Sequence, residues 1–430
     1  MVAWWIAAGT AVFGTGPFGI RALTVLSAIP IFALMYACGR VLFDRPIAAR
    51  GTLWLNATLL VGVGGFIATP DAPSLVFWTA ALLGFLLVVR TGDGRWWLLV
   101  GAATGLGIVS KLTDLFLLPG LLLPLLIRRD LRHWLINPWT WAGVVLAAAI
   151  VAPLVAWNAG HGWVTFASQF SRVTAGHLVP LKPPEFVAGQ FALLNPFVAV
   201  FVGLAVVAWV RRLPAYPTDG IGLLAWTALP LVAYMAFHSL HQEVQANWPT
   251  PVYSTLVLMA AAAAGSAPPR WDGWRILAFP VGAILIVIGL VLSGNPGGIV
   301  PLALDPASPN RGWEAVAAET DAFRRQSDAK WIGAGAYGVV SELSYRLAGT
   351  VPVIPVEGRL RFGYRPLPDP ALAAEPGLIV SANPDGVAGC YPGAVRVGTI
   401  LRKTGDSVID TFGVFTVPSA PPAVFVDGCR

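Results

Sequence analysis

The first residue with clear chemical potential is an acid at the junction of two apolar runs. Asp71 lies in the sequence Ala-Thr-Pro-Asp-Ala-Pro (68–73), between apolar residues 47–67 and 74–89. A carboxylate at the end of a membrane helix is costly unless it reaches water, a cation or a substrate. The two prolines predict a sharp, non-helical turn that holds Asp71 at one membrane face. We interpret this turn as one wall of an active site; the alternative is an interfacial turn that happens to carry an acid.

A lysine is the second candidate. The sequence Ser-Lys-Leu-Thr-Asp (110–114) interrupts an apolar stretch, and Lys111 is predicted to lie at the tip of a tight helical hairpin. An ammonium group is a compact, strongly hydrated charge with three donors, which suits the phosphate of a lipid carrier. The alternative is a structural pair between Lys111 and Asp114 at helical spacing.

Two further polar segments supply the remaining candidates. Residues 157–163, Trp-Asn-Ala-Gly-His-Gly-Trp, contain His161 and continue into a loop with Arg172. Residues 238–249 pack histidines, amides and one acid between apolar runs, including His241, Glu243, Asn247 and Trp248. Amides suit sugar hydroxyls, and Glu243 with the histidines suits metal binding or proton transfer. The alternative for this segment is a solvated loop that caps a helix.

Composition defines the class of protein. The 430 residues are 56% hydrophobic and 12% charged, with a mean hydropathy of +0.69. Soluble domains carry about a quarter charged residues, so the chain is predicted to be an integral membrane protein. The net charge of +6 gathers in short loops, where it orients a membrane protein, and we predict no nucleic-acid partner.

The apolar runs predict about ten membrane-spanning helices, because a span needs roughly 20 mainly apolar residues. We place them at 19–42, 47–67, 73–90, 96–111, 113–127, 138–157, 187–210, 221–238, 249–264 and 274–293. One set of alternate loops carries twelve basic residues and the other set carries four. This positive-inside bias predicts that Asp71, Lys111, the loops 158–186 and 239–248 and everything after residue 294 lie outside the cytoplasm.

The composition changes after residue 294. Residues 295–310 are rich in Gly, Pro, Asn and Ser and indicate a linker between a transmembrane domain (1–294) and a soluble α/β domain (311–430). In that domain we predict helices at 311–326 and 337–348, and strands at 329–334, 351–356, 377–382, 394–401 and 408–417. Cys390 and Cys429 both fall in this domain and could form a disulfide in an oxidising compartment.

Four of these stretches together resemble one family. Residues 68–73, 105–113 (Gly-Leu-Gly-Ile-Val-Ser-Lys-Leu-Thr), 157–163 and 243–253 (Glu-Val-Gln-Ala-Asn-Trp-Pro-Thr-Pro-Val-Tyr) are similar to bacterial GT-C superfamily membrane glycosyltransferases. The closest subset contains proteins like protein O-mannosyltransferases and the lipid A aminoarabinose transferase. The resemblance implies inverting transfer of a sugar from a polyprenyl-phosphate donor to a glycan, lipid or protein acceptor, at the outer face of the bacterial inner membrane.

The resemblance also implies roles for individual residues. Asp71 would organise the acceptor or a divalent metal ion, and from its residue type we predict Glu243 as a second metal ligand. Lys111, together with Arg172, would hold the donor phosphate. Glu243 and Asn247 would belong to a loop over the same cavity. From residue type we predict that His161, His241 and Trp248 bind substrate together with them.

Family members also carry an outer loop with an acidic pair, the usual candidate for the general base, ahead of the part that matches residues 1–14. No acid precedes Asp44 in this sequence, so we expect a start upstream of Met1. Two alternatives remain: a transporter or flippase of lipid-linked sugars, and, if Met1 is the true start, a non-catalytic lipid-sugar binding protein.

Overall fold

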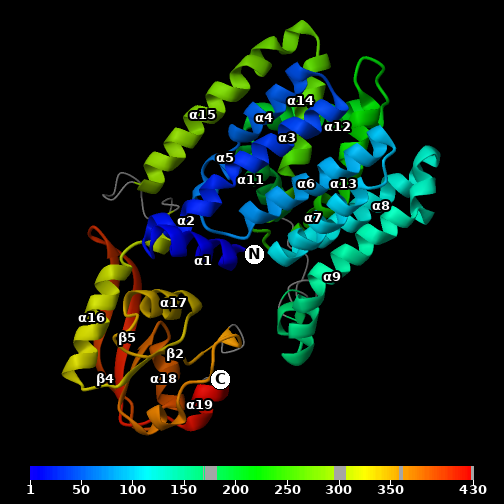
Figure 1. The fold of residues 1–430 in the computed structure, drawn as a ribbon. Helices are drawn as coiled ribbons and strands as arrows, with labels where there is room; N and C mark the ends of the chain where they lie inside the picture. Colours follow the sequence, from blue (N-terminus) through cyan, green and yellow to red (C-terminus); the bar gives the residue numbers. More distant parts are fainter. Residues whose placement is uncertain (168, 170–181, 295–306, 358–361, 428–430) are drawn as a thin grey trace. The chain divides into compact units, whose positions relative to one another are not determined.

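The computed structural model describes residues 1–167, 169, 182–294, 307–357 and 362–427 (Figure 1). It divides into two compact units, Met1–Gly289 and Leu290–Arg430. Most of the predicted linker, residues 295–306, lies outside the described residues, as do Arg172 and Cys429.

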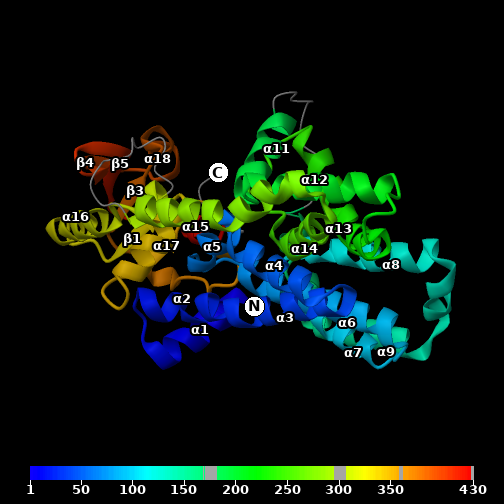
Figure 2. The same cartoon turned by 90° about the horizontal axis from the view of Figure 1, so that it is seen from above.

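The first unit is helical (Figures 1 and 2). Its α-helices are α1 (Val2–Phe13), α2 (Pro17–Leu26), α3 (Ala28–Leu42), α4 (Arg45–Asn56), α5 (Leu59–Gly62), α6 (Asp71–Thr91), α7 (Trp96–Ser110), α8 (Leu117–Ile127), α9 (Pro138–Gly160), α11 (Lys182–Leu193), α12 (Pro196–Val210), α13 (Thr218–Ser239), α14 (Tyr253–Ser266) and α15 (Asp272–Gly294). Short 3-10 segments include η2 (Leu112–Phe116), η3 (Arg129–Ile136) and η4 (Thr250–Val252). Helices α6 and α14 contribute most to the interior of this unit, because about half of the residues of α6 and most of those of α14 are buried.

The helices show a multi-pass membrane protein, but they do not reproduce ten long spans. Among the described residues, five helices are long and apolar enough to cross a membrane, and seven if two bent helix pairs each count as one span. Three shorter apolar helices lie at other predicted spans: Trp96–Ser110, Leu112–Ile127 and Thr250–Ser266. A fourth, Val2–Phe13, lies outside the predicted spans. The total of about ten therefore stays a prediction.

Two of the predicted spans are not continuous helices. Residues 47–67 bend by 61° between α4 and α5, where Thr58 caps the new helix by accepting a hydrogen bond from the Val61 amide. Residues 187–210 bend by 111° between α11 and α12. At that bend Asn195 has φ 73° and is fully buried, and its amide group donates to the Ala278 carbonyl at 2.6 Å. Hydropathy could not detect either bend, because the bends depend on capping and tertiary hydrogen bonds.

The predicted tight hairpin at Lys111 is also wrong. Helix α7 packs on α6 and α9, whereas α8 packs on α13. The α7–α9 approach is close because two glycines face each other: a Cβ on Gly101 would lie 2.1 Å from the Gly143 carbonyl oxygen. Small residues permit such contact between membrane helices, and Figure 2 shows the two helices side by side.

The second unit has the predicted α/β composition. Its helices are α16 (Trp313–Gln326), α17 (Tyr337–Arg346), α18 (Pro384–Cys390) and α19 (Pro422–Asp427), and its strands are β1 (Trp331–Ala334), β2 (Val353–Pro355), β3 (Gly377–Ser381), β4 (Val395–Thr404) and β5 (Ser407–Val417). The sheet order is β2-β1-β3-β5-β4, with β1 parallel to β2 and β3 and the other pairs antiparallel. Cys38 is a buried free thiol and Cys390 is disulfide-bonded. Because Cys429 lies outside the described residues, the Cys390–Cys429 pair stays a prediction.

A buried arginine joins the start of this unit to its sheet. The Arg402 guanidinium on β4 donates to Asp410 at 2.8 Å and lies 4.6 Å from the centre of the Trp313 ring. It also donates to three backbone carbonyls, those of Ser308, Pro309 and Arg311, at 2.9, 3.1 and 2.9 Å. One side chain thereby satisfies acceptors on segments about 90 residues apart in the chain.

We expect Arg402→Met to destabilise the second unit by about 1–3 kcal/mol, because the substitution leaves partly buried acceptors without a donor. Hydrogen–deuterium exchange of the β4 and β5 amides in the full chain measures this effect. The exposed Arg396 on the same strand is the matched control, and Arg396→Met should change the free energy of opening by less than about 0.5 kcal/mol. Equal exchange in both variants would contradict the assigned role of Arg402.

Candidate functional site

Asp71 is the first residue of α6, and this corrects the prediction of a non-helical turn. Pro70 adopts helical dihedral angles (φ −58°, ψ −12°) as the residue before the helix, and Pro73 lies buried in its first turn. Proline is tolerated there because first-turn amides lack helical partners in any case. The first turn of a helix favours an anion through the helix dipole, so α6 itself holds the carboxylate.

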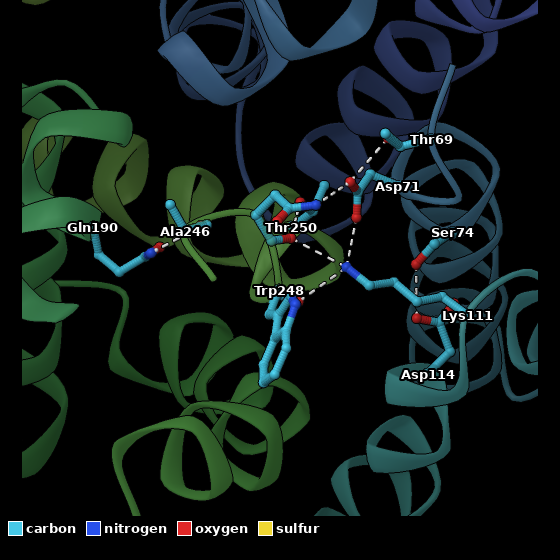
Figure 3. Close-up of polar contacts among 10 residues, drawn as sticks. Thr69, Asp71, Ser74, Lys111, Asp114, Gln190, Ala246, Trp248 and Thr250 are labelled. Atoms are coloured by element: carbon cyan, nitrogen blue, oxygen red, sulfur yellow. Dashed lines mark hydrogen bonds and ion pairs between the residues drawn. The ribbon is translucent and has the colours of Figure 1, made fainter. Parts of the chain in front are cut away.

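Lys111 ends α7 and meets Asp71 across the interface between the two helices. Its Nζ lies 2.5 Å from Asp71 Oδ1, and both side chains are only about 15% exposed (15% and 14%). The same Nζ donates to the carbonyl oxygens of Asn247 and Trp248 at 3.1 and 3.2 Å (Figure 3). An ammonium group has three donors, so all three are used.

The 240–249 loop adds a side chain to this pair. Asn247 Nδ2 donates to Asp71 Oδ2 at 2.6 Å, and Thr69 Oγ1 donates to the same oxygen at 2.9 Å. Thr250 Oγ1 donates to the Asn247 carbonyl at 2.5 Å, which fixes the loop where η4 begins. Asp71 therefore organises donors from three separate segments of the chain.

The alternative pairing of Lys111 with Asp114 is wrong. Asp114 is 1% exposed and accepts a hydrogen bond from Ser74 Oγ at 2.7 Å. This contact ties η2 to the first turns of α6 and leaves Lys111 directed at Asp71, as Figure 3 shows. The sequence analysis missed this contact, for which Ser74, a hydroxyl residue in the first turns of the largely apolar α6, was the available signal.

The ion pair borders two cavities of the first unit. One, of about 420 Å³, is lined by Lys111, Trp248, His238 and Tyr234, among others. The other, of about 320 Å³, is mainly apolar and is bounded by α3 and the α4–α5 bend. Thr69, Asp71 and Asn247 line both cavities, so the hydrogen-bonded group forms the wall between them.

Four of the predicted site residues meet here: Asp71, Lys111, Asn247 and Trp248. His161 and His241 do not line either cavity. Each binds the backbone of its own helix: His161 Nδ1 lies 2.7 Å from the Trp157 carbonyl, and His241 Nδ1 lies 3.2 Å from the Phe237 carbonyl. Tyr234 and Thr165, which sequence reasoning missed, line the larger cavity instead.

The predicted metal ligands are not brought together. Glu243 is an exposed residue 3.6 Å from Lys182 and lines a separate cavity with Glu185. Asp71 already has the Lys111 ammonium beside it, which repels a second cation. Within the described part of the chain no group of three or more His, Cys, Asp or Glu side chains is placed to hold a metal ion. The donor set at Asp71 therefore does not fit a divalent metal.

The chain therefore combines a multi-pass helical unit, which holds a lysine–carboxylate site at its helix ends, with a small mixed sheet, and comparisons with known proteins find similar proteins. Residues 1–157 match the family model described as dolichyl-phosphate-mannose-protein mannosyltransferase. The solved structure of ArnT from Cupriavidus metallidurans in the apo state has the same fold, with a TM-score of 0.63 at 17% identity, covering 98% of this chain and 88% of that one. The form bound to undecaprenyl phosphate gives a TM-score of 0.64.

Proteins with similar sequences include transferases of the same kind as the solved structures. The undecaprenyl phosphate-alpha-4-amino-4-deoxy-L-arabinose arabinosyl transferase of Erwinia tasmaniensis is 28% identical over 68% of this chain, which spans 54% of that relative. The protein of that name from Pseudomonas paraeruginosa is 25% identical over 84% of this chain and 75% of its own length. Lipid A galacturonosyltransferase RgtD of Rhizobium johnstonii is 22% identical over 82% of this chain and 75% of its own length. These matches confirm the predicted resemblance to bacterial GT-C membrane glycosyltransferases.

Proposed function

We propose that this protein transfers a sugar from a polyprenyl-phosphate carrier to a lipid acceptor of the lipid A type at the outer face of the inner membrane. The observation that carries the proposal is the Lys111 ammonium, held by Asp71 and two carbonyls at the edge of a cavity of about 420 Å³. A fixed cation at the ends of apolar helices is where a lipid-borne phosphate can dock. The names of the relatives support the donor class and the acceptor class.

The chemistry assigned to these residues is charge stabilisation. An acceptor hydroxyl attacks the anomeric carbon, the bond from that carbon to the phosphate oxygen breaks, and polyprenyl phosphate leaves with the electron pair. Lys111 stabilises the negative charge that develops on the leaving phosphate, since donors aimed at developing charge lower a barrier most. The neutral carbonyls of Asn247 and Trp248, at 3.1 and 3.2 Å, are the partners that an anionic phosphate replaces.

Asp71 is assigned to positioning rather than to proton abstraction. Both of its oxygens are already engaged, Oδ1 by Lys111 and Oδ2 by Thr69 and Asn247. Among the described residues that line the larger cavity it is the only carboxylate. The base that accepts the proton of the acceptor hydroxyl is therefore assigned to a residue outside this group, in agreement with the acidic pair that the family resemblance implies.

The membrane orientation follows from the loop charges and is part of the proposal. The basic loops face the cytoplasm, so the Asp71–Lys111 site and the C-terminal α/β unit lie on the opposite side. A polyprenyl-phosphate donor already carries the activated bond between sugar and phosphate, so the reaction needs no nucleotide on that side of the membrane. The disulfide at Cys390 supports an oxidising compartment for that unit.

The full chain in proteoliposomes tests the function directly. With radiolabelled undecaprenyl-phosphate-linked aminoarabinose or galacturonic acid and lipid A, the label should move to lipid A. Label that crosses the bilayer on its carrier without transfer would assign the protein to the flippases and would contradict the proposal. Donor binding without either outcome would assign a non-catalytic binding protein.

Removal of the Asn247 side chain should lower the rate of transfer less than removal of either charged residue, but by a measurable factor. We expect Asn247→Ala to lower kcat about tenfold, because Asp71 loses a 2.6 Å hydrogen bond while the backbone carbonyl that holds Lys111 remains. Gln245→Ala, two residues away on an exposed position that lines a different cavity, is the matched control and should keep full activity. Equal rates for the two variants would remove Asn247 from the site.

A further inference from the structure

A fourth hollow shares no lining residue with the two cavities beside Lys111. It is an apolar groove of about 230 Å³ with walls from α7, α8, η3 and α9. Helix α7 begins at Trp96 and Lys111 follows its last residue, so the first turn of α7 lies roughly 20 Å from the ammonium at about 1.5 Å per residue. The groove is therefore separate from the site described above.

Three polar atoms in this groove are buried without a partner. Trp97 Nε1, Thr104 Oγ1 and Thr140 Oγ1 make no hydrogen bond within the described part of the chain. Their residues are 5%, 2% and 9% exposed, and all three line the groove. Buried polar groups in proteins are almost always paired. An indole N–H can only donate, so the missing partner offers an acceptor oxygen beside Trp97.

The groove opens sideways to the surroundings of the helices. Three of its large apolar lining residues are strongly exposed: Leu122 by 44%, Trp141 by 58% and Val144 by 50%. In a membrane protein these positions face hydrocarbon. A long acyl chain can therefore enter between α8 and α9, where a polar solute cannot.

Two connections rich in arginine lie at the end of the groove that holds Trp97 and Thr140. The α6–α7 and α8–α9 connections meet there, since the Trp97 and Trp134 rings lie 6.4 Å apart. These connections and the adjoining helix ends carry five arginines against two aspartates: Arg90, Arg95, Arg128, Arg129 and Arg132, with Asp93 and Asp130. Arg128 is paired with Asp130. Arg95 and Arg129 are exposed and form no ion pair with any described residue. The rim is thus suited to an anion.

We propose that this groove binds an anionic phospholipid. The phosphate lies on the rim formed by Arg95 and Arg129, ester oxygens accept hydrogen bonds from Trp97 and Thr140, and an acyl chain follows the groove between α8 and α9. Basic rims next to clefts between membrane helices recognise anionic headgroups in this way. The arginines on the rim, the unpaired donors next to them and the apolar groove follow one another in the same order as the phosphate, the ester groups and the acyl chains of a phospholipid.

Native mass spectrometry of the full chain in a mixture of phosphatidylglycerol and phosphatidylcholine tests the proposal. The two lipids share ester groups and chains and differ in headgroup charge. We expect the wild type to retain phosphatidylglycerol on the order of tenfold more than phosphatidylcholine. Arg95→Ala with Arg129→Ala should abolish this preference, and Arg211→Ala with Arg212→Ala, a pair of arginines on another connection, should preserve it.

A second experiment tests the proposal by filling the groove with a larger side chain. Val144→Trp places an indole in the groove and should lower phosphatidylglycerol retention about tenfold. Val145→Trp, the next residue of α9, is 67% exposed and does not line the groove, so it should bind like the wild type. Thermal melts of both variants check folding. Equal retention of the two lipids by the wild type, or equal retention by the two tryptophan variants, would overturn the proposal. Dimerisation on lipid removal that Val144→Trp blocks would instead assign the groove to a second copy of the chain.

Discussion

Replacing Lys111 by alanine is expected to lower the rate of sugar transfer on the order of 10³-fold. The ammonium is the cation assigned to the leaving phosphate, and loss of one donor aimed at developing charge costs about 10²–10³ in kcat. A full charge at a site whose side chains are only about 15% exposed belongs at the upper end of that range. Donor binding should weaken as well, because phosphate and ammonium attract each other before the reaction. Rates with a labelled polyprenyl-phosphate donor measure both kcat and KM.

Lys182→Ala is the matched control for this experiment. Lys182 also lies next to carboxylates, Glu185 at 2.9 Å and Glu243 at 3.6 Å, but it lines a different cavity. Its removal should change the rate by less than about twofold, as exposed ion pairs contribute little. Lys111→Arg keeps the charge and should restore part of the lost rate. Full activity of Lys111→Ala would contradict the assigned role of the ammonium.

Replacing Asp71 by asparagine is expected to lower kcat about 10²-fold with little change in the fold. Asparagine has the shape of aspartate, but its amide can accept at one atom only, while Asp71 accepts from Lys111, Thr69 and Asn247. Lys111 would then lose the anion that aims it, and a misplaced charge costs rate even when it remains present. Circular dichroism and thermal melts distinguish this loss from unfolding.

The double variant separates positioning from independent catalysis. If Asp71 acts only through Lys111, Asp71→Asn added to Lys111→Ala should cost little further rate, since residues that work as a unit are not additive. Asp93→Asn, at an exposed position on the connection after α6, serves as the control and should leave kcat unchanged. Fully additive losses at Asp71 and Lys111 would assign Asp71 a separate role.

Hydropathy, charge and turn residues were sufficient for much of the architecture. The strands of the second unit and the positions of Asp71 and Lys111 at helix ends followed from local patterns, because burial imposes a period on the chain and lipid penalises charge. The predicted strand at 377–382 appears as Gly377–Ser381 and the predicted helix at 311–326 as Trp313–Gln326. The family resemblance added the expectation of a lipid-phosphate donor.

Tertiary structure alone decided which polar residues share a site. Asp71, Lys111 and Asn247 are separated by 40 and 136 residues, and local patterns do not encode such distances. The same patterns left a Lys111–Asp114 pair open as an alternative and did not separate His161, His241 and Glu243 from the residues that line the cavity. Side-chain direction settled these points: Asp114 turns to Ser74, the histidines bind their own helices, and Glu243 faces Lys182. The sequence determined which polar residues lie at helix ends, because lipid penalises charge within a span. The packing of α6 against α7 and the 240–249 loop decided which of these residues contact one another.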